Sequence, residues 1–142
     1  QAYYEPEPRI EFALAAAGLM TACIDISDGL AGDLGHILKS SGVGGDVNST
    51  LIPYSSAAMA HVSLEGRLQA ALYGGDDYEL CFTAPKQVEE QLHRIAASQN
   101  VGLQKIGEIT NGSGLRLLDE RGTEILQPNQ AYQHFAPSVS SK

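Results

Sequence analysis

The stretch CIDISDGLAGDLGHILKSSG, residues 23–42, decides the interpretation of the fold, because a strand-like pattern changes there into a helix-like one. Residues 19–26 (LMTACIDI) form a short apolar run between turn-forming residues, which predicts a buried strand. From Leu30 to Leu38, leucine and isoleucine recur at i, i+4, i+7 and i+8, the spacing of one apolar helix face. Gly42 suits the end of that helix. The stretch therefore predicts a strand followed directly by a helix.

Two carboxylates and a serine lie at this junction. Asp25 is expected to end the strand, and Ser27 and Asp28 are expected at the helix start. Unpaired N–H groups and a partial positive charge make a helix start suitable for binding phosphate. Carboxylates three residues apart across a bend can point at one spot, and Mg²⁺ accepts one or two carboxylates together with water and phosphate oxygens. The pattern is compatible with Mg²⁺ on Asp25 and Asp28 and a phosphate oxygen on Ser27.

The same residues also have a purely structural interpretation. Ser27 and Asp28 are good N-cap residues, and an N-cap contributes about 1 kcal/mol without any ligand. The spacing alone does not decide between a capped helix and a metal site. Asp33 lies five residues after Asp28, towards the other side of the helix, and we expect it to be solvated and outside the site.

A second acidic cluster, YGGDDYEL, occupies residues 73–80. Gly74 and Gly75 allow positive φ angles and close backbone approach, and Asp76 and Asp77 follow them directly. One interpretation is a helix end followed by a polar turn into a strand. The other is a glycine hinge that presents a carboxylate to a ligand. The residues alone leave both open.

The remaining patterns predict an α+β fold in which helices pack on a mixed β-sheet. Further helices are predicted at residues 9–18, 55–62, 63–75 and 85–99. Further strands are predicted at residues 44–53 and 78–84, and two or three more over residues 102–109 and 114–126, which the turn TNGSG joins. We expect one domain at 10–137, a lead-in or linker at 1–9 and a disordered tail at 138–142.

Composition narrows the classes of function. The 142 residues are 43% hydrophobic and 18% charged, which is ordinary for a folded soluble protein, and no apolar run approaches the about 20 residues of a membrane helix. The net charge is −8 and the nine lysines and arginines are scattered, so nucleic acid and anionic membranes are poor partners. Cys23 and Cys81 lie in apolar, strand-like segments, which favours buried free thiols over a disulfide. The glycine motifs of P-loops and dinucleotide-binding folds do not occur.

Taken together, the two acidic motifs resemble a known family. IDISDGLAGDLGHI, followed about 50 residues later by GGDDYELCFT, is similar to the C-terminal half of the thiamine-monophosphate kinase family. The segments PEPRI, LIPYS and AYQHFAP also look like that family, so the resemblance runs from Pro8 to about Pro137. It implies the C-terminal domain of an aminoimidazole-ribotide synthetase-like architecture built from two α+β domains.

The resemblance also implies an activity and a set of site residues. The family transfers phosphate from ATP, with Mg²⁺, to thiamine monophosphate and forms thiamine diphosphate. By resemblance, Asp25 and Asp28 bind Mg²⁺ and Ser27 contacts ATP. Asp76 and Tyr132 contact the thiamine phosphate substrate. No residue is implied as a covalent or acid–base catalyst, because positioning and metal ions dominate phosphoryl transfer.

The family's N-terminal half is not part of these 142 residues. We therefore expect the remaining metal ligands and most contacts of a homodimer to belong to a missing N-terminal domain of the same protein. The whole protein is expected in the cytoplasm, and the chain alone is expected to fold without kinase activity. The alternatives are another ATP-using relative, such as aminoimidazole-ribotide or selenophosphate synthetase, a non-catalytic module that binds metal or nucleotide, or aspartates that only cap helices.

Overall fold

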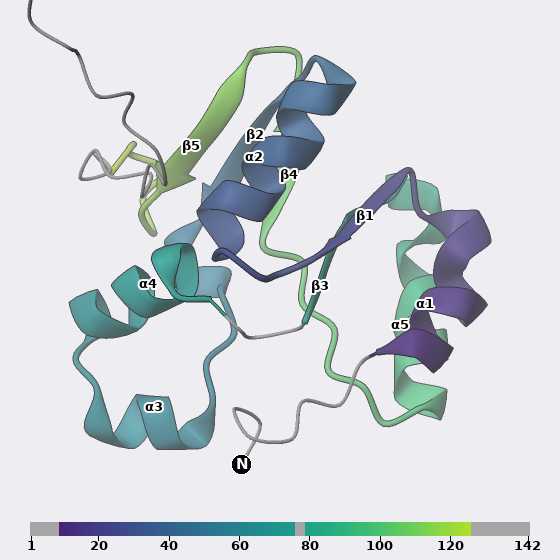
Figure 1. The fold of residues 1–142 in the computed structure, drawn as a ribbon, viewed down its shortest axis with the longest axis horizontal. Helices are drawn as coiled ribbons and strands as arrows, with labels where there is room; N and C mark the ends of the chain where they lie inside the picture. The colour runs from purple at the N-terminus through teal and green to yellow at the C-terminus, as the bar shows by residue number, and fades with distance from the viewer. Residues whose placement is uncertain (1–8, 76–78, 126–142) are drawn as a thin grey trace, which may run out of the picture.

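The computed structural model describes residues 9–75 and 79–125 (Figure 1). Its α-helices are α1 (Ile10–Ala16), α2 (Leu30–Ser41), α3 (Ser56–His61), α4 (Leu64–Tyr73) and α5 (Glu89–Ser98). Its β-strands are β1 (Ala22–Asp25), β2 (Gly44–Asn48), β3 (Leu80–Thr83), β4 (Gly107–Thr110) and β5 (Gly114–Leu118). Short 3₁₀ helices occupy Ala17–Leu19, Ser49–Leu51 and Lys86–Val88. Every helix and strand predicted from the sequence has a counterpart here.

A three-stranded mixed sheet confirms the predicted α+β class. Its strand order is β4-β2-β5, with β2 antiparallel to β4 and parallel to β5. The turn between β4 and β5 therefore joins strands on opposite sides of β2, rather than the two arms of a hairpin. Strand β2 is shorter than predicted, because the Asn48 side chain accepts a hydrogen bond from the Thr50 N–H at 2.9 Å and starts a 3₁₀ helix.

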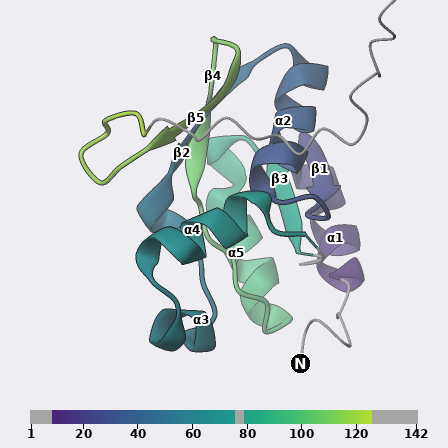
Figure 2. The same cartoon turned by 60° about the vertical axis from the view of Figure 1, so that its left-hand side comes forward.

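A separate antiparallel pair, β1 and β3, lies between this sheet and the helices α1 and α5 (Figures 1 and 2). Alternate residues of the pair face two different cores. Ile24 and Cys81 belong to the core built around α2 and the three-stranded sheet. Leu80 and Phe82 pack on the other side against α1 and α5. The predicted single mixed sheet is therefore two sheets among the described residues.

Helix α2 holds the larger core together. Its apolar stripe, predicted from the sequence, is buried against β2, β5 and α4. Leu38 and Leu117 are almost fully buried, at 1% and 2% exposure. Burying one such side chain contributes about 1.5–3 kcal/mol, so this packing fixes α2 firmly. Gly42 ends the helix at φ 66°, as predicted. The position of the β1–α2 junction follows from this rigid helix.

The two cysteines differ in their surroundings. Both thiols are free, but Cys23 is exposed, so the prediction that both are buried was wrong for this residue. Its side chain lies on the same face of the pair as Phe82, opposite the α2 core, whereas Cys81 faces that core. Burial, the neighbouring Cys23 and the Asp33 carboxylate together raise the pKa of Cys81 from 9.0 to about 11.

This pKa predicts an alkaline loss of stability. Because the folded protein resists ionisation of Cys81 and the unfolded chain does not, the stabilising contribution is complete below pH 9 and is lost as pH rises towards 11. The free energy of unfolding should fall by about 2 kcal/mol over that range from this thiol. Urea unfolding at several pH values measures it. In a Cys81→Ala variant, the free energy of unfolding should fall less steeply with pH. An equally steep fall in both proteins would contradict the assignment of the pH dependence to Cys81.

No helix among the described residues is long and apolar enough to cross a membrane.

Candidate functional site

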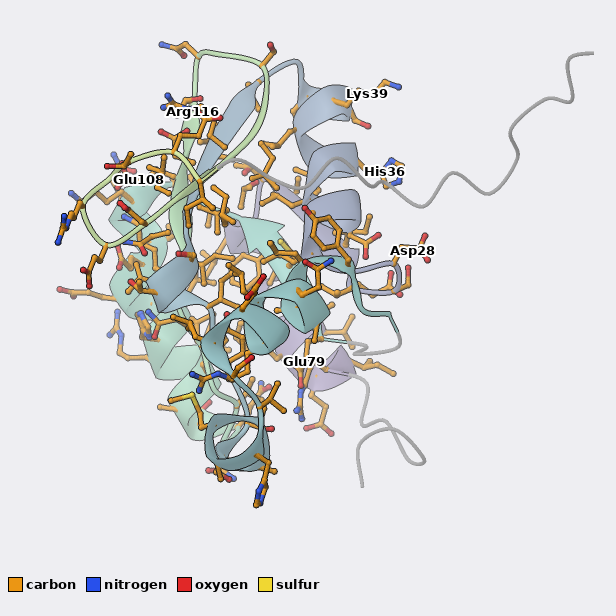
Figure 3. All side chains as sticks on the ribbon, turned by 90° about the vertical axis from the view of Figure 1, so that its left-hand side faces the viewer. Asp28, His36, Lys39, Glu79, Glu108 and Arg116 are labelled. Atoms are coloured by element: carbon orange, nitrogen blue, oxygen red, sulfur yellow. The ribbon has the colours of Figure 1, made fainter. Side chains whose placement is uncertain are left out.

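The loop between β1 and α2 carries the three residues predicted to bind metal and nucleotide. Asp25 ends β1, opposite Leu80 of β3, and its side chain is exposed. Ser27 and Asp28 follow in the loop and are also exposed. Figure 3 shows the Asp28 side chain projecting away from the body of the protein. The loop thus presents two carboxylates and a hydroxyl to solvent within four residues.

The start of α2 differs from the predicted cap. Its N-cap residue is Gly29, at φ 92° and ψ 154°, and no side chain caps the helix. Neither Ser27 nor Asp28 has this role, because the turn of the chain at Gly29 separates both from the helix. Among the described residues, no N-cap side chain accepts from the first-turn amides of α2. Unpaired amides at a helix start are a recurrent binding site for phosphate.

Asp33 is buried, and the prediction that it is solvated was wrong. Its exposure is 3%. Its carboxylate oxygen Oδ2 accepts hydrogen bonds from the Ser27 N–H at 2.8 Å and the Asp28 N–H at 3.0 Å. Asp33 lies three residues after the buried Leu30, so it shares the inward face of α2. That helical spacing was visible in the sequence and could have placed it correctly.

The second acidic motif begins directly against this loop. A Cβ atom on Gly75 would lie 2.4 Å from the Ser27 carbonyl oxygen. A Cβ atom on Gly29 would lie 2.5 Å from the Leu72 carbonyl oxygen and 2.9 Å from that of Gly74. Real Cβ contacts are longer than 3.0 Å, so only glycine allows the end of α4 to lie on the loop at these positions. The two motifs singled out in the sequence are therefore in backbone contact. Asp76 and Tyr132, predicted to contact substrate, lie outside the described residues.

Residues 2–120 match the profile of the family described as AIR synthase related protein, C-terminal domain. The chain belongs to this family. Thiamine-monophosphate kinase of Escherichia coli strain K12 is 38% identical over 135 residues, covering 94% of this chain and 41% of the relative. The resemblance inferred from the two motifs is therefore confirmed.

Solved structures agree with this membership. The crystal structure of thiamine-monophosphate kinase from Stenotrophomonas maltophilia K279a has a TM-score of 0.77 and 39% identity, covering 79% of this chain and 35% of that chain. AaThiL complexed with AMPPCP and TMP has a TM-score of 0.69 and 27% identity, covering 88% and 38%. The chain thus spans about two fifths of the length of these relatives.

In this AIR synthase related C-terminal domain, the donor set of the loop fits a hard divalent cation. Carboxylate oxygens are the ligands that Mg²⁺ prefers, and one or two suffice when water and phosphate complete the octahedron. Asp25 and Asp28 are exposed and form no salt bridge with another described residue. Within residues 9–75 and 79–125 no group of three or more His, Cys, Asp and Glu side chains gathers as a ready-made metal site. Further ligands would have to come from substrate, water or other parts of the protein.

Proposed function

We propose that this chain is the C-terminal part of a kinase that transfers a phosphoryl group from ATP to thiamine monophosphate, giving thiamine diphosphate. The observation that carries the proposal is the contact of the two acidic motifs, with Gly75 lying against the Ser27 carbonyl. Relatives named thiamine-monophosphate kinase and a neighbour complexed with AMPPCP, an ATP analogue, and TMP support it. In the proposed reaction, the β1–α2 loop and the acidic segment after α4 would belong to one active site.

The proposal gives each predicted residue a role. Asp25 and Asp28 would hold Mg²⁺, and Ser27 would contact ATP, because all three are exposed on one loop beside the start of α2, where Gly29 supplies no side-chain cap. Asp76 follows Gly75 directly in the sequence and would contact the phosphate-bearing substrate. Tyr132 would pack its ring on the cationic thiamine heterocycle.

These roles fit the chemistry of phosphoryl transfer. An oxygen of the thiamine monophosphate phosphate attacks the γ-phosphorus of ATP, and the bond from that phosphorus to the bridging oxygen of ADP breaks. The acceptor is already a nucleophile, so the chain needs no strong general base. Bound Mg²⁺ would neutralise charge between the two anions. Asp25 and Asp28 would hold the metal at the loop, and the amides at the start of α2 would orient phosphate.

The proposal includes partners for the whole protein. The relatives are longer than this chain, and we infer that an N-terminal domain supplies the other side of the site and the contacts of a homodimer. The cytoplasm, where ATP is made available, is the proposed location. The chain alone would hold only part of the site and would show no turnover.

One experiment separates the candidate functions. Two proteins are compared: the chain alone, and the chain extended by the N-terminal portion that the relatives carry. Each is mixed with Mg²⁺, ATP and thiamine monophosphate, and thiamine diphosphate is quantified by chromatography. Product from the extended protein only is expected. Product from the isolated chain, above that of an Asp25→Ala and Asp28→Ala control, would show that the missing domain is not required.

Other results would favour the alternatives. Binding of Mg²⁺ and ATP without product in either form would support a non-catalytic module. Phosphorylation or ATP cleavage only with another acceptor would support a different ATP-using relative. No binding in either form would leave the aspartates as ordinary surface residues.

A further inference from the structure

We propose that Asp33 is a positioning residue that holds the Ser27–Asp28 backbone in the shape needed for metal and nucleotide binding, an inference that rests on the proposed function. Asp33 itself would touch neither metal nor nucleotide. It is 3% exposed and lies on the inward face of α2. Asp33 would act through the β1–α2 loop, whose backbone it binds.

Two side-chain hydrogen bonds fasten the loop to Asp33, next to the first backbone hydrogen bond of the helix itself. One carboxylate oxygen, Oδ2, accepts from both the Ser27 and the Asp28 N–H groups, at 2.8 and 3.0 Å. The Asp33 N–H donates to the Gly29 carbonyl oxygen at 3.1 Å. Residues 27 to 29 are thus tied to one residue of a helix that the core holds rigidly. The backbone of the loop has little freedom left.

The Ser27 and Asp28 side chains form no hydrogen bond or salt bridge with another residue of the described part of the chain. Ser27 and Asp28 are good helix caps by type, yet neither caps α2. A buried carboxylate, which is costly to desolvate, binds their amides instead. A local rule broken in this way is expected at functional sites rather than in ordinary helix starts. Because Asp33 binds the main chain, the two side chains stay exposed and are held in place.

A second aspartate in the chain provides a matched control. The Asp119 carboxylate oxygen Oδ1 accepts hydrogen bonds from the Arg121 and Thr123 N–H groups, both at 2.8 Å, in the turn after β5. Asp119 thus accepts two backbone hydrogen bonds as Asp33 does, but in a turn that carries neither motif. Removing the Asp119 carboxylate tests whether loss of two such hydrogen bonds is enough to change ligand binding.

The experiment compares Asp33→Ala, Asp33→Asn and Asp119→Ala with the wild-type protein. Amide hydrogen exchange of Ser27 and Asp28 is measured in the chain without metal. The affinity for Mg²⁺ with AMPPCP is measured by calorimetry in the protein extended by the N-terminal portion of its relatives. Asp33→Ala should exchange both amides at least tenfold faster and bind about 10- to 100-fold more weakly. Asp33→Asn keeps an oxygen acceptor and should remain within about threefold of wild type in both measurements, and Asp119→Ala should match wild-type affinity.

The outcomes separate this inference from the function beneath it. Wild-type affinity in the Asp33→Ala variant would overturn the role of Asp33 while leaving the proposed function intact. Asp33→Asn could weaken ligand affinity as much as Asp33→Ala while its two loop amides stay protected from exchange. That result would show that the Asp33 charge acts directly, and it would overturn the positioning role. A wild-type protein that binds neither Mg²⁺ nor AMPPCP would overturn the metal and nucleotide assignment itself, and the inference with it.

Discussion

Replacing both Asp25 and Asp28 by asparagine in the extended protein should lower kcat for thiamine diphosphate formation by about 10³-fold or more. The reason is electrostatic, because transfer between two anions depends on charge neutralisation by metal held at these carboxylates. Both side chains are exposed and form no salt bridge with a described residue, so the free energy of unfolding should change by no more than about 0.5 kcal/mol. Steady-state assays over a range of Mg²⁺ concentrations and thermal unfolding measure the two effects separately.

A matched variant makes this result specific. Glu120→Gln also removes one exposed carboxylate, in the turn after β5, and should leave kcat and its Mg²⁺ dependence unchanged. Single Asp25→Asn and Asp28→Asn variants should each require more Mg²⁺ for half-maximal rate. Full activity of the double variant at ordinary Mg²⁺ concentration would show that neither aspartate is a ligand.

The β1–α2 unit could be predicted from the sequence because its signals are local. The apolar spacing from Leu30 to Leu38 fixes the buried face of a helix, and Gly42 ends it in the left-handed conformation that glycine adopts easily. The short apolar run before Asp25 is long enough for one strand only. Such features depend on neighbours within about one helical turn, so one sequence suffices to find them.

The structure differs from the prediction where contacts between segments distant in the sequence determine the local conformation. Ser27 and Asp28 are suitable caps by residue type, but packing of Gly29 against the end of α4 turns the chain before the helix begins. Cys23 is exposed, although its partner Phe82 on β3 packs against α1 and α5. The placement of β4 and β5 on either side of β2 likewise depends on pairings more than 50 residues apart.

Asp33 is a different case, because its burial was within reach of local reasoning. It occupies the same helix face as Leu30 and Ile37, three residues after one and four before the other. The expectation that it is solvated rests on its position five residues after Asp28, which overlooks that it shares the face of Leu30 and Ile37. In the structure, the two amides of residues 27 and 28 satisfy the buried carboxylate. A charged residue on an otherwise apolar stripe is thus a signal for a buried acceptor of backbone hydrogen bonds.

Gly29→Ala should be the most damaging single substitution for the fold of the site. Its φ of 92° is strained for alanine, and the new Cβ would meet three backbone atoms, the nearest at 2.5 Å. Backbone atoms cannot move aside as a flexible side chain can, so α4 and the loop must separate. We expect a loss of about 3 kcal/mol or more in the free energy of unfolding, a fall in Tm of about 10 °C, and loss of ligand binding with it. Urea unfolding and calorimetry measure the first two.

Gly35→Ala, in the same helix, should have the opposite sign. Apart from its own helix backbone, no described residue has an atom within 4 Å of the Cβ that it adds, and alanine in a helix interior is more stable than glycine by about 0.5–1 kcal/mol. The two substitutions add the same methyl group to α2 or its cap, so their difference reports the positive φ of Gly29 together with the contact between the motifs. If Gly29→Ala were as well tolerated as Gly35→Ala, the end of α4 would not press on the loop. The assignment of both acidic motifs to one site would then lose the observation that carries it.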